Sequence, residues 1–178
     1  MNRRRRGFSL IEVVIALGVV SYALLLIVAL VPHGVKTNKA SALETRATCI
    51  LSLLEADLRN SHPLVNEGKS KYFGLQLPYS LNAAKRVIVN PALSENTLSD
   101  ANSAGVDDNE MPVAASAASR PPFQVAVVYT RLPGATSSPV EARLVVRWPY
   151  AGTSNVSSLI SATTDGGYVE SFVAFPAP

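Results

Sequence analysis

The hydrophobic pattern begins with a long apolar segment near the N-terminus. From Val13 to Val31, nineteen residues pass without a charge. At about 1.5 Å per residue this run makes a helix of ~28 Å, close to the ~30 Å hydrocarbon core of a bilayer. The pattern therefore predicts a transmembrane helix over residues 8–31.

Helical periodicity continues over residues 32–60, now with one apolar face. Charged residues lie largely off that face, which is typical of a helix packed on a sheet. The residues of the apolar face recur at spacings of three and four: Ala40, Leu43, Ala47, Ile50, Leu51, Leu54 and Leu58.

Two features could divide this long helical region. Pro32 and Gly34 predict a kink or a local loosening, because Pro removes a backbone hydrogen bond and crowds the preceding turn. Ser41-x-x-Glu44 has the spacing of a capping box, which would start a separate helix there. The alternative is one helix, continuous or kinked, that ends at Ser61-His62-Pro63.

Residues 61–178 predict a globular domain built on an antiparallel sheet. Strand candidates are residues 72–77, 86–89, 123–131, 141–148, 159–164 and 168–175, the last two flanking the favoured hairpin turn Asp165-Gly166. Trp148, followed by Pro149, is interpreted as an anchor at the sheet edge. Between the strand candidates at 86–89 and 123–131, residues 91–122 are rich in Ala, Ser, Asn, Asp and Pro, and this composition predicts a flexible insertion. The fold class is α+β.

The positive charge is concentrated at the N-terminus. Residues 1–7 hold four of the 16 Lys and Arg, at Arg3, Arg4, Arg5 and Arg6, which leaves 12 basic against 13 acidic side chains and a net charge of −1. Basic residues flanking an apolar helix stay on the cytoplasmic side. The pI near 9.2 therefore reflects a targeting signal, and no nucleic-acid partner is expected.

The junction between the basic and apolar segments resembles a known processing site. Arg6-Gly7-Phe8-Ser9-Leu10-Ile11-Glu12 is similar to the sequence at which type IV prepilins and the pseudopilins of type II secretion are cleaved. The motif also resembles a verrucomicrobial group of prepilin-type cassette proteins. Two other readings remain open, a secretory signal peptide and an unprocessed single-pass anchor. The apolar core is long for a signal peptide, and no A-x-A cleavage site follows it.

The resemblance implies a leader at residues 1–7, cleaved between Gly7 and Phe8 by a membrane aspartyl peptidase, and N-methylation of Phe8. It implies that Glu12 pairs with the terminal amine of a neighbouring subunit in a filament. A charge in apolar surroundings needs such a partner. It also implies a pilin-like fold, in which a continuous or kinked helix packs on the sheet.

Motifs for catalysis or metal binding do not occur in the sequence. His33 and His62 are interpreted as surface and loop residues, and the single Cys49 as a small buried residue that cannot build a zinc site. Asp107-Asp108-Asn109-Glu110 lacks the alternating oxygen spacing and turn glycine of a calcium loop. No enzyme activity, cofactor or metal is expected.

Two functions are consistent with these features. The first is a minor pilin or pseudopilin, a single-pass inner-membrane subunit with a cytoplasmic N-terminus and a periplasmic or extracellular domain. Its partners would be the prepilin peptidase, other subunits, the inner-membrane assembly platform and lipid. The second is an exported binding module on a prepilin anchor. An exposed patch formed by Tyr129, Trp148 and Tyr150 would favour the second, and burial of these residues would favour the first.

Overall fold

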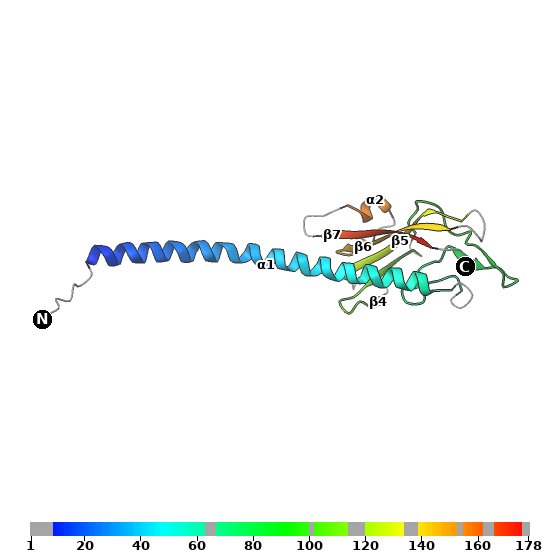
Figure 1. Cartoon of the computed structure of the whole chain (residues 1–178), viewed down its shortest axis with the longest axis horizontal. Helices are drawn as coiled ribbons and strands as arrows, with labels where there is room; N and C mark the ends of the chain where they lie inside the picture. Colours follow the sequence, from blue (N-terminus) through cyan, green and yellow to red (C-terminus); the bar gives the residue numbers. More distant parts are fainter. Residues whose placement is uncertain are drawn as a thin grey trace. The chain divides into compact units, whose positions relative to one another are not determined.

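The computed structural model describes residues 9–62, 67–99, 102–113, 120–133, 139–152, 155–161 and 166–175. The chain forms two compact units, Met1–Ser41 and Ala42–Pro178. Helix α1 (Leu10–Asn60) is followed by a two-stranded sheet of β1 (Tyr79–Leu81) and β2 (Val87–Val89). A five-stranded antiparallel sheet has the order β4-β3-β5-β6-β7 (Figure 1). Its strands are β3 (Ser103–Val106), β4 (Pro112–Val113), β5 (Phe123–Arg131), β6 (Val140–Trp148) and β7 (Gly167–Phe175), and the short helix α2 (Val156–Leu159) precedes β7. The predicted α+β class is confirmed.

Helix α1 is continuous over 51 residues, with Pro32 inside it. No separate helix begins at Ser41, and the predicted end before Pro63 is confirmed. A proline removes only its own N–H, so the neighbouring turns keep their hydrogen bonds. Three hydroxyl groups along the helix donate to the carbonyl oxygen four residues earlier: Thr37 to His33 at 3.0 Å, Thr48 to Glu44 at 2.9 Å and Ser52 to Thr48 at 3.1 Å.

The main core lies between α1 and one face of the five-stranded sheet, here called the inner face. Ala47, Ile50, Leu54 and Leu58 are buried on the helix, in agreement with the periodicity. They pack in one cluster with alternate residues of the central strands. On β5 these are Phe123, Val125, Val127 and Tyr129, and on β6 they are Val140, Ala142, Leu144 and Val146.

The opposite or outer face of the sheet is partly covered by α2 (Figure 1). Leu159 of α2 and Leu98 pack there on Ala126, Val128 and Val145. Because α1 covers one face and α2 the other, β5 is buried without interruption from Phe123 to Tyr129. This explains why residues 125–129 form a continuous apolar run and not an alternating one, while the buried Gln124 before them is hydrogen-bonded to Ser103 and to the Ala151 N–H.

Arg147 is buried beneath α2. Its guanidinium donates to the carbonyl oxygens of Ser158 and Leu159, where the last turn of α2 leaves acceptors without intrahelical partners. At the start of α2, the side-chain oxygen of Asn155 accepts from the Ser157 N–H at 2.9 Å. Both ends of the short helix are thus satisfied by side chains.

The end of α1 is connected to the following loop by Asp57 and Ser61. The Asp57 carboxylate accepts from the backbone N–H groups of Tyr72 at 2.9 Å and Phe73 at 3.0 Å. Ser61 donates to the same carboxylate and accepts from the Lys71 N–H at 2.8 Å. These bonds hold residues 71–73 as a turn, so the strand predicted at residues 72–77 is wrong.

Several other sequence predictions are also corrected. The flexible insertion predicted at residues 91–122 is wrong where the structure describes that segment, because β3 and β4 lie within it and β3 pairs with β5. The strand predicted at 159–164 is wrong at its start, where Leu159 belongs to α2, and residues 162–165 lie outside the described part. Cys49 is exposed, because it lies beside the buried stripe of α1 and not on it.

Trp148 occupies a different position from the predicted sheet edge. It ends β6, which lies between β5 and β7, and is half-buried. Its ring meets Phe123 edge-on, with centroids 6.5 Å apart, and covers Gly167. A Cβ at Gly167 would lie 2.7 Å from the Trp148 ring, so only glycine fits without displacing the indole.

Replacement of Leu54 by Ala should destabilise the globular unit. The Leu54 side chain is fully buried in the helix–sheet core, and such truncations cost about 2–5 kcal/mol in the free energy of unfolding. Leu53→Ala is the matched control, since its neighbour Leu53 is 41% exposed and should change stability by less than about 1 kcal/mol. Urea unfolding of the detergent-solubilised full chain, followed by Trp148 fluorescence, measures both; equal losses would contradict the packing.

Candidate functional site

The first turn of α1 holds the charged residue of the apolar segment. The helix begins at Leu10, and the Ser9 carbonyl oxygen accepts from the N–H groups of Glu12 at 3.0 Å and Val13 at 3.3 Å. Ser9 thus has the position of the N-cap, and Glu12 is the third helical residue. Ser9-x-x-Glu12 therefore has the spacing of a capping box.

Sequence reasoning misses this role of Ser9. It identifies the same spacing at Ser41 and Glu44, but it places residue 9 inside the predicted membrane helix. The first four N–H groups of a helix lack intrahelical partners, and the helix dipole is positive at this end. A carboxylate is therefore favoured in this turn before any other subunit is considered.

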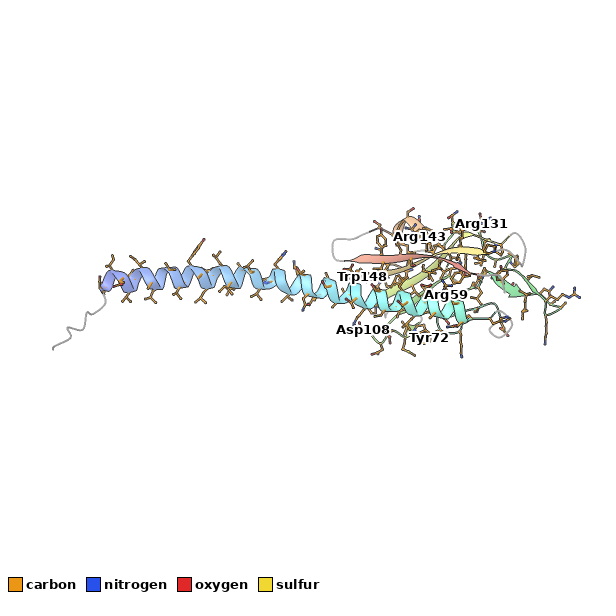
Figure 2. The ribbon with its side chains drawn as sticks, viewed as in Figure 1. Arg59, Tyr72, Asp108, Arg131, Arg143 and Trp148 are labelled. Atoms are coloured by element: carbon orange, nitrogen blue, oxygen red, sulfur yellow. The ribbon has the colours of Figure 1, made fainter. Side chains whose placement is uncertain are left out.

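The helix surface that follows is apolar on all sides. Large apolar side chains are exposed throughout residues 10–35, with Leu10 at 86%, Leu25 at 71% and Leu30 at 68%. Figure 2 shows side chains on both sides of this part of α1. Soluble monomers rarely expose so large a continuous apolar surface, and a helix apolar all round is typical of a membrane span.

In the described chain, α1 is the one helix long and apolar enough to cross a membrane, and none of its most apolar window is buried. It fits a single-pass anchor. Glu12 stands near one end of this span, where a carboxylate costs less than at the centre of the bilayer.

The other predicted site residues are distributed as follows. Arg3, Arg4, Arg5, Arg6, Gly7 and Phe8 lie outside the described residues. Pro32 and Gly34 both lie inside α1, and a bend at this place stays a prediction. His33 is exposed on the same helix and its carbonyl oxygen accepts from Thr37. His62 is exposed just after the helix ends.

The acidic segment at residues 107–110 closes the turn between β3 and β4. One oxygen of Asp107 accepts from the N–H groups of Asn109 at 2.9 Å and Met111 at 2.8 Å. Asp108 forms an ion pair of 3.2 Å with Arg46 on α1, and Figure 2 shows Asp108 beside that helix. Across the described residues, no group of three or more His, Cys, Asp or Glu is placed to hold a metal ion.

The three aromatic residues proposed as a binding patch do not form an exposed one. Tyr129 is 1% exposed, and its hydroxyl donates to the Gln76 carbonyl oxygen at 2.7 Å. Burial raises the pKa of the Tyr129 hydroxyl, because the phenolate would lose its hydration. Trp148 and Tyr150 are half-buried.

Comparison with known proteins identifies the N-terminal segment. The family model of the prokaryotic N-terminal methylation motif matches residues 2–31. This region contains the basic residues, the Gly7-Phe8 junction, Glu12 and the apolar part of α1. No characterised protein and no solved structure matches the chain significantly.

Two arginines in the apolar segment should strongly weaken membrane anchoring, whereas one should leave most of it. Residues 13–31 contain thirteen Val, Leu and Ile. Each favours insertion into the membrane by ~0.3–0.6 kcal/mol, which makes about 4–8 kcal/mol together. One central Arg costs about 2.5–3.5 kcal/mol, so Leu24→Arg leaves a favourable sum. With Val20→Arg added, the two Arg cost about 5–7 kcal/mol against about 3–7 kcal/mol from the eleven apolar residues that remain, which brings the sum close to zero. The measurement is the fraction of the protein that resists carbonate extraction from membranes.

The matched control for this prediction is the double variant Val20→Ala with Leu24→Ala, which should stay in the membrane. Complete retention of the double-Arg variant in the carbonate-resistant fraction would contradict a membrane span at this segment.

Proposed function

We propose that this type IV pilin-like chain is a minor pilin or pseudopilin, a structural subunit that prepilin peptidase processes and that assembles into a filament anchored in the inner membrane. One observation carries the proposal. The prepilin-type methylation motif at residues 2–31 coincides with a helix whose apolar side chains are exposed on all sides and whose first turn holds Glu12. Such a surface can anchor the chain in the membrane and can also pack against the helices of neighbouring subunits.

Processing would act on the segment before the helix. The four arginines keep the N-terminus on the cytoplasmic side, and the domain built from residues 42–178 would then be periplasmic or extracellular. Cleavage between Gly7 and Phe8 makes Phe8 the new N-terminus. Ser9 is then the one residue between this terminus and the start of α1 at Leu10. The amine of Phe8 would receive one methyl group.

Assembly would use the first turn of the mature helix. Glu12 is exposed, and a carboxylate moved among apolar helices is tolerated only with a cationic partner. The terminal amine of Phe8 in a neighbouring subunit would supply the positive charge. This pair would set the axial position of each entering subunit, and the apolar surface of residues 10–35 would exchange lipid contacts for contacts with other helices.

The alternative, an exported binding module on a prepilin anchor, has less support. The aromatic residues suggested for a ligand surface are needed inside the domain: Tyr129 in the core and Trp148 over Gly167. The carboxylates of Asp57 and Asp107 also have structural roles, because they accept hydrogen bonds from backbone N–H groups in turns.

Processing is tested by the N-terminal mass of the protein isolated from membranes. In cells with prepilin peptidase we expect a chain that starts at N-methylated Phe8, and in cells without the peptidase a chain that keeps residues 1–7. Mass spectrometry of the N-terminal peptide distinguishes the two. An identical uncut terminus in both strains would leave a simple membrane anchor and remove the filament proposal.

Replacement of Glu12 by Ala should leave processing intact but strongly reduce incorporation into filaments, because the entering subunit loses its pairing charge. Glu44→Ala is the matched control, as Glu44 is an exposed carboxylate of the same helix with the same Ser-x-x-Glu spacing. The ratio of variant to wild type is measured in sheared filaments from cells that express both. Equal incorporation of the Glu12 variant would remove the pairing role.

A further inference from the structure

Two lysines follow the apolar segment of α1. Lys36 and Lys39, here called the lysine pair, are both exposed on the helix. They are three residues apart, so they are neighbours on one face. No Asp or Glu occurs anywhere in residues 13–43. The pair therefore lies in a long stretch of the chain that has no acidic side chain.

The lysine pair has no anionic partner within the described part of the chain. The ion pairs formed there have arginine as the basic residue, and neither Lys36 nor Lys39 takes part in one. Like charges at neighbouring positions of a helix repel one another and lower its stability. An external anion close to both ammonium groups would remove this repulsion.

The distance of the pair from the membrane span indicates which anion it meets. The apolar segment ends at Val31. At ~1.5 Å per residue, the Cα atom of Lys36 lies about 7.5 Å beyond Val31 along the helix axis, and that of Lys39 about 12 Å. The headgroup layer of a bilayer adds about 5–7 Å on each side of the hydrocarbon core. The backbone of the pair is thus placed at the outer limit of the headgroups.

The direction of the side chains brings the ammonium groups back toward the lipid. The Cα–Cβ bonds of an α-helix tilt toward its N-terminus, and for Lys36 and Lys39 this is the direction of the apolar segment. Lysine side chains near the ends of membrane helices extend to place the charge at the polar boundary, while their methylene groups cover apolar surface. Both ammonium groups can therefore reach the depth of the lipid phosphates.

We propose that the lysine pair binds the phosphate groups of anionic phospholipids in the leaflet at this end of the span. Each ammonium group has three N–H donors, and a lipid phosphodiester supplies a negative charge with oxygen acceptors. In phosphatidylcholine the same phosphate stands beside a cationic amine, which repels the pair. The preference is therefore for lipids of net negative charge, such as phosphatidylglycerol.

This binding is compatible with the orientation proposed for the chain. Orientation follows the side of the span with more Lys and Arg, and the four arginines at residues 3–6 outnumber the two lysines. The lipid contact depends on the membrane span and not on processing. If residues 1–7 are removed as proposed, the lysine pair becomes the group of basic side chains closest to the apolar segment.

Lipid binding is tested with the full chain, purified in an uncharged detergent from cells without prepilin peptidase. The parent protein carries Gln at positions 3–6 in place of the four arginines, so that the lysine pair is the basic group next to the span. Lys36→Gln with Lys39→Gln removes the pair. Lys69→Gln with Lys71→Gln is the matched control, because both are exposed lysines of the globular unit and the same charge is lost.

Native mass spectrometry measures the dissociation constants for added phosphatidylglycerol and phosphatidylcholine, and Trp148 fluorescence checks that each variant is folded. A lysine beside anionic lipid contributes a factor of ~5 in affinity, so loss of the pair should weaken phosphatidylglycerol binding about 25-fold. The matched control should bind as the parent does, and Lys36→Arg with Lys39→Arg should retain the binding. The parent should bind phosphatidylcholine several-fold more weakly.

Three results would overturn the proposal. The first is equal affinity of the parent for the two lipids, which would leave the pair to an acidic protein partner. The second is unchanged phosphatidylglycerol binding without the pair. The third is an equal loss in the matched control, which would mean that net charge alone matters. None of these results bears on cleavage at Gly7 or on assembly through Glu12, which are tested separately.

Discussion

The contact between the buried stripe of α1 and the inner face of the sheet is the interaction on which the rest of the domain depends. Ala47, Ile50, Leu54 and Leu58 supply one side of the core, and β5, β6 and β7 supply the other. The apolar face of a sheet and the apolar stripe of a helix must each be buried against another element, and here they bury one another. The hydrogen bonds of Asp57 and Ser61 then hold the end of that helix against the turn at residues 71–73.

The same helix meets two different solvation requirements along its length. In residues 10–35 the apolar side chains surround the axis, which is suited to lipid or to neighbouring apolar helices. From Ala42 onward the buried apolar side chains lie on one face, and the opposite face carries Thr45, Cys49 and Ser52. The change from an all-round to a one-sided apolar pattern separates the assembly segment from the segment that organises the domain.

The features that could be predicted are those with a strong local signal. The stripe on α1 and strands β5 and β6 are predicted by periodicity and continuous β-rich runs, and Glu12 by its place in a short motif. The strand β3 is missed because Ser103, Ala104 and Gly105 have little apolar character; it is held by backbone pairing with β5. Residue 159 is misassigned because a short apolar run does not separate strand from helix. The exposure of Cys49 depends on one helical position relative to Ile50.

Three hydroxyl groups in the second half of α1 have a consequence for how this part of the helix meets other chains. Thr37, Thr48 and Ser52 each donate to a carbonyl oxygen of their own helix, so these donors need neither water nor a partner chain. A polar group that is satisfied in this way loses little when its surroundings become less polar. These three residues follow the apolar segment, so this part of α1 can pass from water to contact with neighbouring chains without leaving a hydroxyl donor unmet and without changing its internal hydrogen bonds.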